Sequence, residues 1–367
     1  MHRAKARERG KPKVSGAALR DEGKQTEEQA ERHCGIKGSI NYGRNGVKTR
    51  IIGTGSCLPG TVVTNDDLSK VMDTSDEWIS SRTGIRERHL VKEETTASMS
   101  VEAAKRAMKD AGVTAEEIDL IILGTVSADF VTPACACEVQ AAIGAANAVA
   151  FDINAACAGF MFALNIANAY IQAGIYRTAL ILGAETLSKI VDWEDRSTCV
   201  LFGDGAGAAV VRGDEQYGLL AFDQGSDGTK GDVLACPGRT NNNPLIQTDQ
   251  RLGFVHMDGQ EVYKFAVTTV PASLQKTIET AGLTPKDIDY FALHQANIRI
   301  LQSVSKRLHI GEDKFPISLD HCGNISAASV PILLDEMNRK GLLKPGMKVA
   351  LSGFGGGLTW ASAVLEW

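Results

Sequence analysis

The pattern of apolar and polar positions predicts short strands that alternate with amphipathic helices. Residues 148–153 are mostly apolar over a strand-like length, and apolar positions then recur every three or four residues from 160 to 171 until Gly174. A similar helix is predicted at 101–111, followed by a strand at 120–123. This alternation indicates an α/β fold.

The chain contains a repeat with a constant offset of 170 residues. Residues 111–124 can be aligned with 281–294, with Ala, Gly, Thr, Ile, Asp and Leu at shared positions. The same offset relates Cys157 to Ala327, which also lies among small residues at a predicted helix start. A chance recurrence of a common helix-turn-strand pattern is the alternative. We interpret the pattern as an internal duplication, with two sheets packed around shared central helices.

The repeat and the charge distribution together predict three segments. Residues 1–47 form a basic tail without a fold of its own, because the first 50 residues hold 13 Lys/Arg against 6 Asp/Glu and few large apolar residues. Residues 48–215 form the first half and 216–367 the second half. The tail lacks the apolar segment of a signal peptide, and its acidic residues argue against a transit peptide. Nucleic-acid binding by the tail is an alternative to plain solvation.

Composition indicates an ordinary globular protein of 367 residues with eight cysteines. The cysteines are scattered and contain no Cys-x-x-Cys pair, so neither a disulfide framework nor a zinc site is expected. A reducing cytoplasm is therefore the predicted location. The most apolar region, 148–171, is interrupted by Asp152 and Asn154, so no membrane span is predicted.

Cys157 lies at the predicted junction between a strand and a helix, among small residues. The unpaired N–H groups and partial positive charge of a helix start favour a thiolate there. Lowering a thiol pKa from ~8.5 to ~7 requires about 2 kcal/mol, whereas a helix end usually supplies ~0.3–1 kcal/mol. A nucleophilic Cys157 therefore needs a partner such as histidine. The alternative is a buried, inert cysteine.

His294 and Asn324 occupy similar junctions in the second half. His294 follows the predicted strand 290–293, where an imidazole suits proton transfer or donation to an oxyanion. Asn324 precedes a helix start, where its side-chain amide can donate to a developing oxyanion. The alternative role of Asn324 is an N-cap. Because strand ends in a duplicated α/β fold can converge on one crevice, we expect both to lie near Cys157. A Cys-His-Asn set resembles a cysteine acyl-transfer site.

The sequence also contains two glycine-rich stretches, interpreted as loops, and one basic helix face. The segment 353–357 permits close approach of a ligand, and one of its N–H groups can complete an oxyanion hole; the alternative is a tight bend. The segment 203–207 lacks the strand-loop-helix setting of a phosphate loop. Arg299, Lys306 and Arg307 share one face of a predicted helix, which either docks an acidic partner or is simply solvated.

Four segments taken together closely resemble β-ketoacyl-acyl carrier protein synthase III, and the likeness covers residues 48–367. These segments are 154–160, 294–297, 323–329 and 353–357. The resemblance implies a duplicated thiolase-like α/β fold in which two mixed sheets pack around central helices in five layers (α-β-α-β-α). It also implies a cytoplasmic homodimer and an acyltransferase that starts fatty acid biosynthesis. The implied reaction joins an acyl-CoA, with acetyl-CoA expected, to malonyl-acyl carrier protein and releases CoA and carbon dioxide. It implies no metal and no cofactor beyond the CoA thioester, and no nucleic-acid or membrane partner.

The resemblance also assigns roles to individual residues. Cys157 accepts the acyl group as a thioester. His294 and Asn324 hold the malonyl thioester carbonyl while the carboxylate leaves, and they stabilise the resulting enolate-like carbanion. The backbone N–H groups of Cys157 and Gly356 hold the tetrahedral oxyanion.

Three further sets are implied around this centre. The CoA-binding set is Thr74, Trp78, Arg82, Arg196 and Asn297, in which Trp78 and Arg82 sandwich the adenine. The acyl-pocket set is Thr132 and Phe354. The carrier-protein docking set is Lys264, Arg299, Lys306 and Arg307. Many acetyl-primed members carry Phe where this chain has Thr132, on a loop that the partner subunit contributes, so a longer or branched starter is an open alternative.

Several related enzymes make different predictions at the same positions. A degradative thiolase should have a second cysteine within 353–357, an elongating synthase should have histidine in place of Asn324, and a plant-type polyketide synthase normally has proline in the terminal glycine segment; none of these is found. Two alternatives stay open. One is a starter-unit condensing enzyme or acyltransferase of a specialised polyketide or quinolone-type pathway, and the other is a non-catalytic acyl-binding scaffold.

Overall fold

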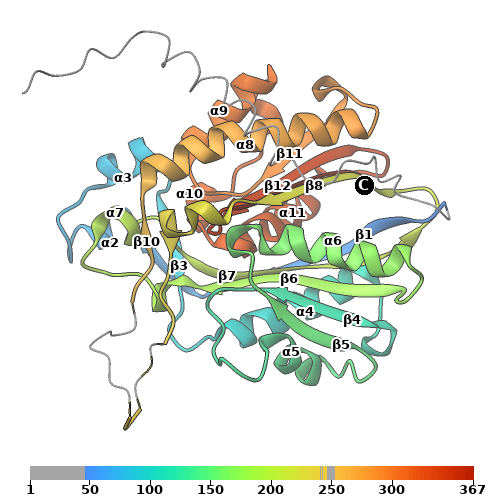
Figure 1. Cartoon of the computed structure of the whole chain (residues 1–367), viewed down its shortest axis with the longest axis horizontal. Coiled ribbons are helices and arrows are strands. Elements are labelled where there is room, and N and C mark those ends of the chain that lie inside the picture. The colour runs from blue at the N-terminus through green and yellow to red at the C-terminus, as the bar shows by residue number, and fades with distance from the viewer. Residues whose placement is uncertain (1–45, 240, 242, 246–252) are drawn as a thin grey trace, which may run out of the picture. The chain divides into compact units, whose positions relative to one another are not determined.

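The computed structural model describes residues 46–239, 241, 243–245 and 253–367. Residues 1–45 of the predicted basic tail lie outside the described residues. Two sheets account for most of the strands (Figure 1). The first sheet has the order β1-β7-β6-β4-β5, with β4, β5 and β6 parallel to one another and β7 antiparallel to both of its neighbours. Its strands are β1 (Lys48–Cys57), β4 (Leu120–Gly124), β5 (Val149–Ile153), β6 (Thr178–Thr186) and β7 (Asp204–Asp214).

The second sheet is built from the later part of the chain in the order β11-β12-β13-β8. Strands β11 and β12 are parallel, and the other pairs are antiparallel. The strands are β8 (Gly218–Ser226), β11 (Tyr290–Leu293), β12 (Lys348–Gly355) and β13 (Thr359–Glu366). Both sheets are therefore mixed, as the sequence analysis predicted.

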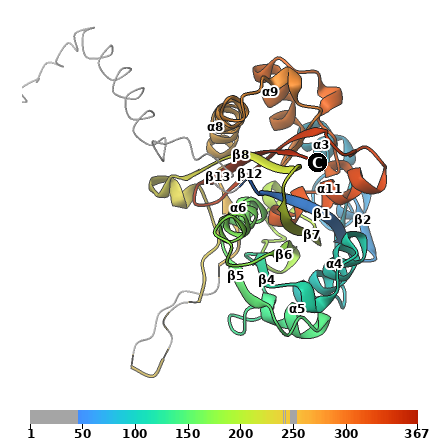
Figure 2. The same ribbon diagram turned by 90° about the vertical axis from the view of Figure 1, so that its right-hand side faces the viewer.

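Two helices lie between the sheets, and the largest buried cluster forms around them (Figures 1 and 2). Helix α6 (Gly159–Gln172) contributes Leu164 and helix α11 (Ser329–Arg339) contributes Leu333. Side chains from both sheets, including Ile181 and Leu351, pack into the same cluster. These two helices are thus the shared central layer.

Each sheet is covered on its other face by a second pair of helices. Helices α4 (Thr96–Ala111) and α5 (Cys135–Ile143) pack on the first sheet. Helices α8 (Gly259–Thr280) and α9 (Ile298–Leu308) pack on the second. The predicted five-layer α-β-α-β-α arrangement is therefore confirmed.

The remaining elements are short and lie mostly around the ends of the strands. They are β2 (Thr61–Thr64), α2 (Asn65–Leu68), α3 (Asp76–Thr83), β3 (Glu87–Leu90), η1 (Ala115–Glu117), η2 (Ala156–Ala158), η3 (Leu187–Lys189), α7 (Arg196–Cys199), η4 (Gly228–Val233), β9 (Leu234–Ala235), β10 (His256–Met257), η5 (Pro285–Asp287), η6 (Glu312–Lys314), α10 (Leu319–Cys322) and η7 (Ser326–Ala328). Within the described ranges, no helix combines the length and apolar character that crossing a membrane requires.

The 170-residue repeat is visible in backbone geometry as well as in sequence. The 3₁₀ helices η2 and η7 are related by this offset, and their first residues, Ala156 and Ser326, have φ angles of 45° and 44°. Asp119 accepts a hydrogen bond from the backbone N–H of Thr178 at 3.0 Å, and Asp289 accepts one from Lys348 at 2.8 Å. Duplicated side chains therefore support duplicated strand starts, and the predicted duplication is confirmed.

One segment differs from its prediction. Residues from Asp204 onward belong to β7, so the glycine-rich loop expected at 203–207 is mostly strand. The glycines here serve close packing against α11. A Cβ on Gly207 would lie 2.7 Å from the backbone nitrogen of Ile332, so only glycine lets the strand and the helix approach.

Candidate active site

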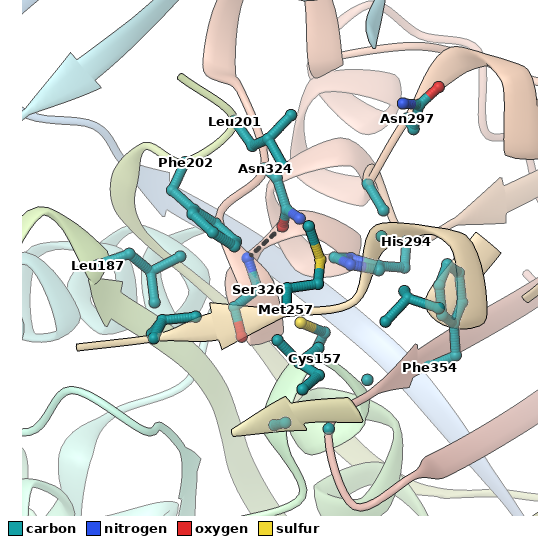
Figure 3. Close-up of a pocket in the computed structure, with 18 of the residues that line it drawn as sticks. Cys157, Leu187, Leu201, Phe202, Met257, His294, Asn297, Asn324, Ser326 and Phe354 are labelled. Carbon is teal, nitrogen blue, oxygen red and sulfur yellow. Dashed lines mark hydrogen bonds between the residues drawn. The ribbon is translucent and has the colours of Figure 1, made fainter. Parts of the chain in front are cut away.

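One pocket of about 330 Å³ is lined by residues from both halves of the chain (Figure 3). Cys157 reaches it from η2, His294 from the loop after β11, and Asn324 from the residues before η7. Although these residues are far apart in sequence, the fold brings all three predicted catalytic side chains to one cavity.

Cys157 is held between the start of α6 and the end of β12. A Cβ on Gly355 would lie 2.6 Å from the Cys157 backbone nitrogen, and a Cβ on Gly353 would lie 3.2 Å from its carbonyl oxygen. Both glycines belong to strand β12 and not to the expected loop. Their missing side chains allow the strand to pass directly behind the nucleophile. Gly356, the second predicted oxyanion donor, also lines the pocket.

The predicted thiolate at Cys157 is not favoured by this environment. Burial raises the pKa of the Cys157 thiol to about 12, even though hydrogen bonding with Ser326 acts in the opposite direction. The expectation from the helix start was therefore wrong, because desolvation outweighs the modest effect of a helix end. With a pKa of about 12, the thiol is protonated at physiological pH.

His294 is anchored by its backbone and almost fully buried, with 1% of its surface exposed. The backbone N–H of His294 donates to the Ser352 carbonyl at 2.7 Å, and the imidazole ring packs edge-on against Phe354 with ring centroids 5.1 Å apart. Burial lowers the pKa of His294 to about 3. The imidazole is therefore neutral at physiological pH, which suits hydrogen-bond donation from one ring nitrogen better than action as a cation.

Asn324 is fixed by three hydrogen bonds. Its N–H donates to the Leu201 carbonyl at 2.9 Å, and its own carbonyl accepts from the Gly203 N–H at 3.1 Å. Its side-chain Oδ1 accepts from the Ser326 N–H at 2.9 Å (Figure 3). Because Oδ1 is engaged in this way, the amide nitrogen is oriented as a donor. The N-cap alternative is wrong, because Ile325 is the N-cap residue of η7 and Asn324 precedes it.

The inner walls of the pocket are apolar. Leu187, Phe202, Met257 and Phe354 line it, which suits an acyl chain (Figure 3). Phe354 thus lies where the sequence analysis placed it. Thr132 is exposed and is not among the pocket-lining residues of the described chain, so a role in the acyl pocket depends on a partner subunit.

Trp78, Arg82 and Asn297 also line the pocket, and the guanidinium carbons of Arg82 and Arg196 lie 4.9 and 5.3 Å from the Trp78 ring centroid. Asn297 donates from Nδ2 to the Arg82 carbonyl at 3.1 Å, which ties α9 to α3. Arg196 also pairs with Asp73 at 3.0 Å. Both guanidinium groups therefore lie on one indole, and the adenine sandwich by Trp78 and Arg82 stays a prediction.

The other predicted binding residues lie outside the pocket lining as described here. Thr74 is one of them. Lys264 is exposed, 3.7 Å from Glu261, and Lys306 and Arg307 are exposed at the end of α9. Arg299 donates to the Ser81 carbonyl at 3.0 Å, so it helps to hold α9 against α3 as well as being exposed.

Two residues to which the sequence analysis gave no role complete the site. Ser326 lines the pocket beside Cys157, and Glu185 lies fully buried at the end of β6. Burial raises the pKa of Glu185 to about 7. A lone acidic residue in the apolar strand 178–186 was the available signal. Glu185 was missed because the sequence of a strand does not show which residues pack against it.

His321, Cys322 and Glu336 form a group whose potential ligand atoms lie within 4.8 Å of one another. His321 binds Glu336 through Nε2 at 2.7 Å and Asp320 through Nδ1 at 2.8 Å. Hydrogen bonding with Cys322 and Glu336 raises the pKa of His321 to about 11. We interpret this group as an ion pair between α10 and α11.

Comparison with known proteins agrees with this site. A family model described as 3-oxoacyl-[acyl-carrier-protein (ACP)] synthase III matches residues 151–228, and the model of its C-terminal part matches residues 278–367. The β-ketoacyl-[acyl-carrier-protein] synthase III of Clostridium acetobutylicum is 53% identical over 320 residues, which are 86% of this chain and 98% of that protein.

Solved structures give the same result. The 3-oxoacyl-[acyl-carrier-protein] synthase III of Aquifex aeolicus VF5 is 43% identical with a TM-score of 0.82, covering 87% of this chain and 100% of that one. The priming β-ketosynthase of the R1128 polyketide biosynthetic pathway is 36% identical, also with a TM-score of 0.82, covering 87% and 96%. The chain therefore belongs to the thiolase-fold β-ketoacyl-acyl carrier protein synthase III family.

Proposed function

We propose that this protein is an acyltransferase that starts fatty acid biosynthesis by condensing an acyl-CoA with malonyl-acyl carrier protein. The observation that carries the proposal is that one apolar pocket brings together a cysteine nucleophile and two neutral hydrogen-bond donors. Acyl transfer needs the cysteine nucleophile, and decarboxylation to a carbanion needs the two hydrogen-bond donors. The membership of the family, at 53% identity to a named synthase III, supports the same reaction.

In the first half-reaction, the Cys157 sulfur attacks the thioester carbonyl of acyl-CoA. The tetrahedral oxyanion is held by the N–H groups of Cys157 and Gly356, and CoA leaves with the proton that the thiol loses. The apolar walls around Leu187 and Phe354 take the acyl chain. We place CoA over Trp78 and Arg82 at the edge of the pocket, with Thr74, Arg196 and Asn297 around it.

In the second half-reaction, His294 and Asn324 donate hydrogen bonds to the malonyl thioester carbonyl. As the carboxylate leaves as carbon dioxide, the electron pair moves into an enolate whose oxygen these donors stabilise. The carbanion then attacks the acyl group on Cys157 and releases the Cys157 thiolate, which takes up one proton from solvent to regenerate the thiol. A neutral imidazole suits this role because it donates without being consumed as an acid. The proposed chemistry uses no metal or cofactor.

Replacing Gly355 with alanine is expected to slow acyl loading by roughly 10²-fold, because a misplacement of about 1 Å at a reacting group has an effect of that size. The new Cβ would lie 2.6 Å from the Cys157 nitrogen and 3.0 Å from its Cβ, so the nucleophile must move. Single-turnover release of CoA from acyl-CoA measures this step. Gly60→Ala is the matched control, because its Cβ meets nothing within 4 Å. Equal rates in the two variants would contradict the proposed position of Cys157.

The partners of the reaction follow from the exposed parts of the site. We propose that Lys264, Arg299, Lys306 and Arg307 receive the acidic carrier protein, supported by their exposure on α8 and α9.

We further propose a homodimer in which the Thr132 loop completes the partner's acyl pocket. The neighbouring Phe130 and Val131 are 56% and 86% exposed, which suits a covered interface. We also propose that the protein acts in the cytoplasm, where acyl-CoA is found.

A second candidate is a starter-unit enzyme of a specialised pathway. The similarity to the polyketide-priming synthase described above favours it, and the small Thr132 suits a starter longer than acetyl. The sites of the two candidates are the same, so the difference lies in the acyl group and the carrier protein.

The deciding experiment combines a panel of acyl-CoA primers with malonyl-acyl carrier protein and identifies products by mass spectrometry. The fatty acid function predicts 3-ketoacyl-carrier protein with the general carrier protein and short straight or branched primers. Product only with a pathway-specific carrier protein would support the second candidate. A folded protein that forms no product with any primer would support the scaffold alternative instead.

A further inference from the structure

The loading step requires a proton acceptor that the three predicted catalytic residues do not supply. The Cys157 thiol is protonated at neutral pH because of its burial. His294 is a weak base in its buried position, since burial holds its pKa near 3. An asparagine amide does not accept a proton at physiological pH. A further group must therefore take the thiol proton.

Glu185 is a buried carboxyl group whose position is fixed on one side only. Its Oε2 accepts hydrogen bonds from the Ser127 hydroxyl at 2.5 Å, the Val126 N–H at 3.1 Å and the Thr125 hydroxyl at 3.2 Å. Its Oε1 has no hydrogen-bond partner among the described residues, although its residue is fully buried. A buried carboxylate oxygen without a partner is costly, which indicates a role for it.

Ser326 connects this carboxyl group to the nucleophile. Its hydroxyl oxygen is also buried and without a hydrogen-bond partner in the described part of the chain, and the residue is 3% exposed. The 3₁₀ helix η7, which Ser326 starts, packs against both β6 and η2. The Ser326 hydroxyl lowers the pKa of both Cys157 and Glu185, so it lies close to each, although it forms no well-aligned hydrogen bond with either in this structure. The unpartnered oxygens thus point to one continuous path.

We propose that Ser326 and Glu185 form a proton path that activates Cys157 for acyl transfer. As the sulfur attacks the acyl-CoA carbonyl, its proton passes to the Ser326 oxygen while the Ser326 hydroxyl proton passes to Oε1 of Glu185. When the carbon–sulfur bond to CoA breaks, the same path runs backwards and the proton goes to the CoA thiolate. Ser326 touches the reacting sulfur, and Glu185 is a positioning residue that acts through it. The inference rests on the proposed acyl transfer.

The pH dependence of this path has a definite sign. Glu185 must be ionised to accept the proton, and burial, the largest influence on it, raises its pKa to about 7. The groups that act on it are Ser127, Val126, Ser326 and Thr125, none of which is charged, and its own charge raises the pKa of Cys157. Acyl loading should therefore rise with pH through about 7.

The test compares acyl loading and malonyl decarboxylation in Glu185→Gln. Glutamine keeps an oxygen for the three hydrogen-bond donors but accepts no proton. We expect single-turnover loading at pH 8 to fall by about 10²-fold, as general base catalysis suggests, and its rise with pH near 7 to disappear. Decarboxylation of malonyl-carrier protein, which needs no thiol proton, should stay within about 3-fold of the unmodified enzyme.

Ser326→Ala is the second variant, and the repeat provides a reason to expect it to fold. The equivalent position is Ala156, which has nearly the same φ. The Ser326 backbone N–H that binds Asn324 is retained. This variant should show the same loss of loading. Glu185→Gln should also melt no lower than the parent at pH 8, because a raised carboxyl pKa means that ionisation removes stability as pH rises from about 4.5 to about 7.

Three outcomes would overturn the proton path. One is loading within about 3-fold of the parent in Glu185→Gln, another is a rise with pH that survives in that variant, and the third is an equal loss of loading and decarboxylation. The proposed function fails in a different way, because the unmodified protein itself would then form no acyl-enzyme.

Discussion

Cys157→Ala is expected to abolish covalent acyl loading and to slow overall condensation by at least about 10³-fold, because no other group in the proposed mechanism can carry the acyl intermediate. The physical reason is that Cys157 is the thiol whose backbone lies against Gly355 at the centre of the pocket. Incubation with radiolabelled acetyl-CoA, followed by denaturing separation, measures the loading. The unmodified protein should retain about one label per chain.

The pocket contains its own control for this experiment. Cys236 is exposed and also lines the cavity, so it is the other thiol that an acyl-CoA can meet there. Cys236→Ala should keep the label and the activity. A label that survives in Cys157→Ala and is lost in Cys236→Ala would show that Cys236, and not Cys157, carries the acyl group. That result would remove the basis of the proposed mechanism.

The convergence of Cys157, His294 and Asn324 could be predicted because the repeat relates them. Cys157 and Ala327 are equivalent, and Asn324 precedes Ala327 by three residues, so a fold with two-fold internal symmetry places the two helix starts face to face. The structure shows this symmetry down to the matching φ angles of Ala156 and Ser326. Sequence spacing alone would not have been sufficient. The constant offset made the prediction specific.

Properties that depend on burial could not be predicted in the same way. The sign of the pKa shift at Cys157 was wrong because desolvation depends on surrounding atoms from β12 and η7, which are far away in sequence. The role of Gly353 and Gly355 was misplaced for a similar reason, since the close approach that requires glycine is a contact with η2. Glu185 was missed because its neighbours come from the separate segment 125–127 and from η7.

The two halves of the duplication have divided the chemistry between them. In the proposed mechanism, the first half supplies the nucleophile, and the second supplies the donors at the corresponding junctions. Where η2 carries Cys157, η7 carries the inert Ala327, and where η7 carries Ser326, η2 carries Ala156. Each copy has therefore kept the backbone of a helix start while only one of each pair of positions bears a reactive side chain.

Asn324→Ala is expected to slow malonyl decarboxylation by about 10²- to 10³-fold, the usual effect of removing one oxyanion donor. Acyl loading should change far less, because the amide acts on the malonyl carbonyl and not on acyl-CoA. Release of labelled carbon dioxide from malonyl-carrier protein measures the first step, and single-turnover release of CoA measures the second. Loss of both half-reactions to the same extent would contradict the assigned role.

A second substitution separates the donor from the structural contact of the same side chain. Asn324 Oδ1 accepts from the Ser326 N–H, and alanine removes this bond together with the donor. Asn324→Asp keeps an oxygen for the Ser326 N–H but places an acceptor where the amide nitrogen faced the substrate. Decarboxylation should therefore fall at least as far in the aspartate variant as in the alanine variant. Recovery of decarboxylation with aspartate would mean that Asn324 acts by holding η7 in place, and not by stabilising the enolate.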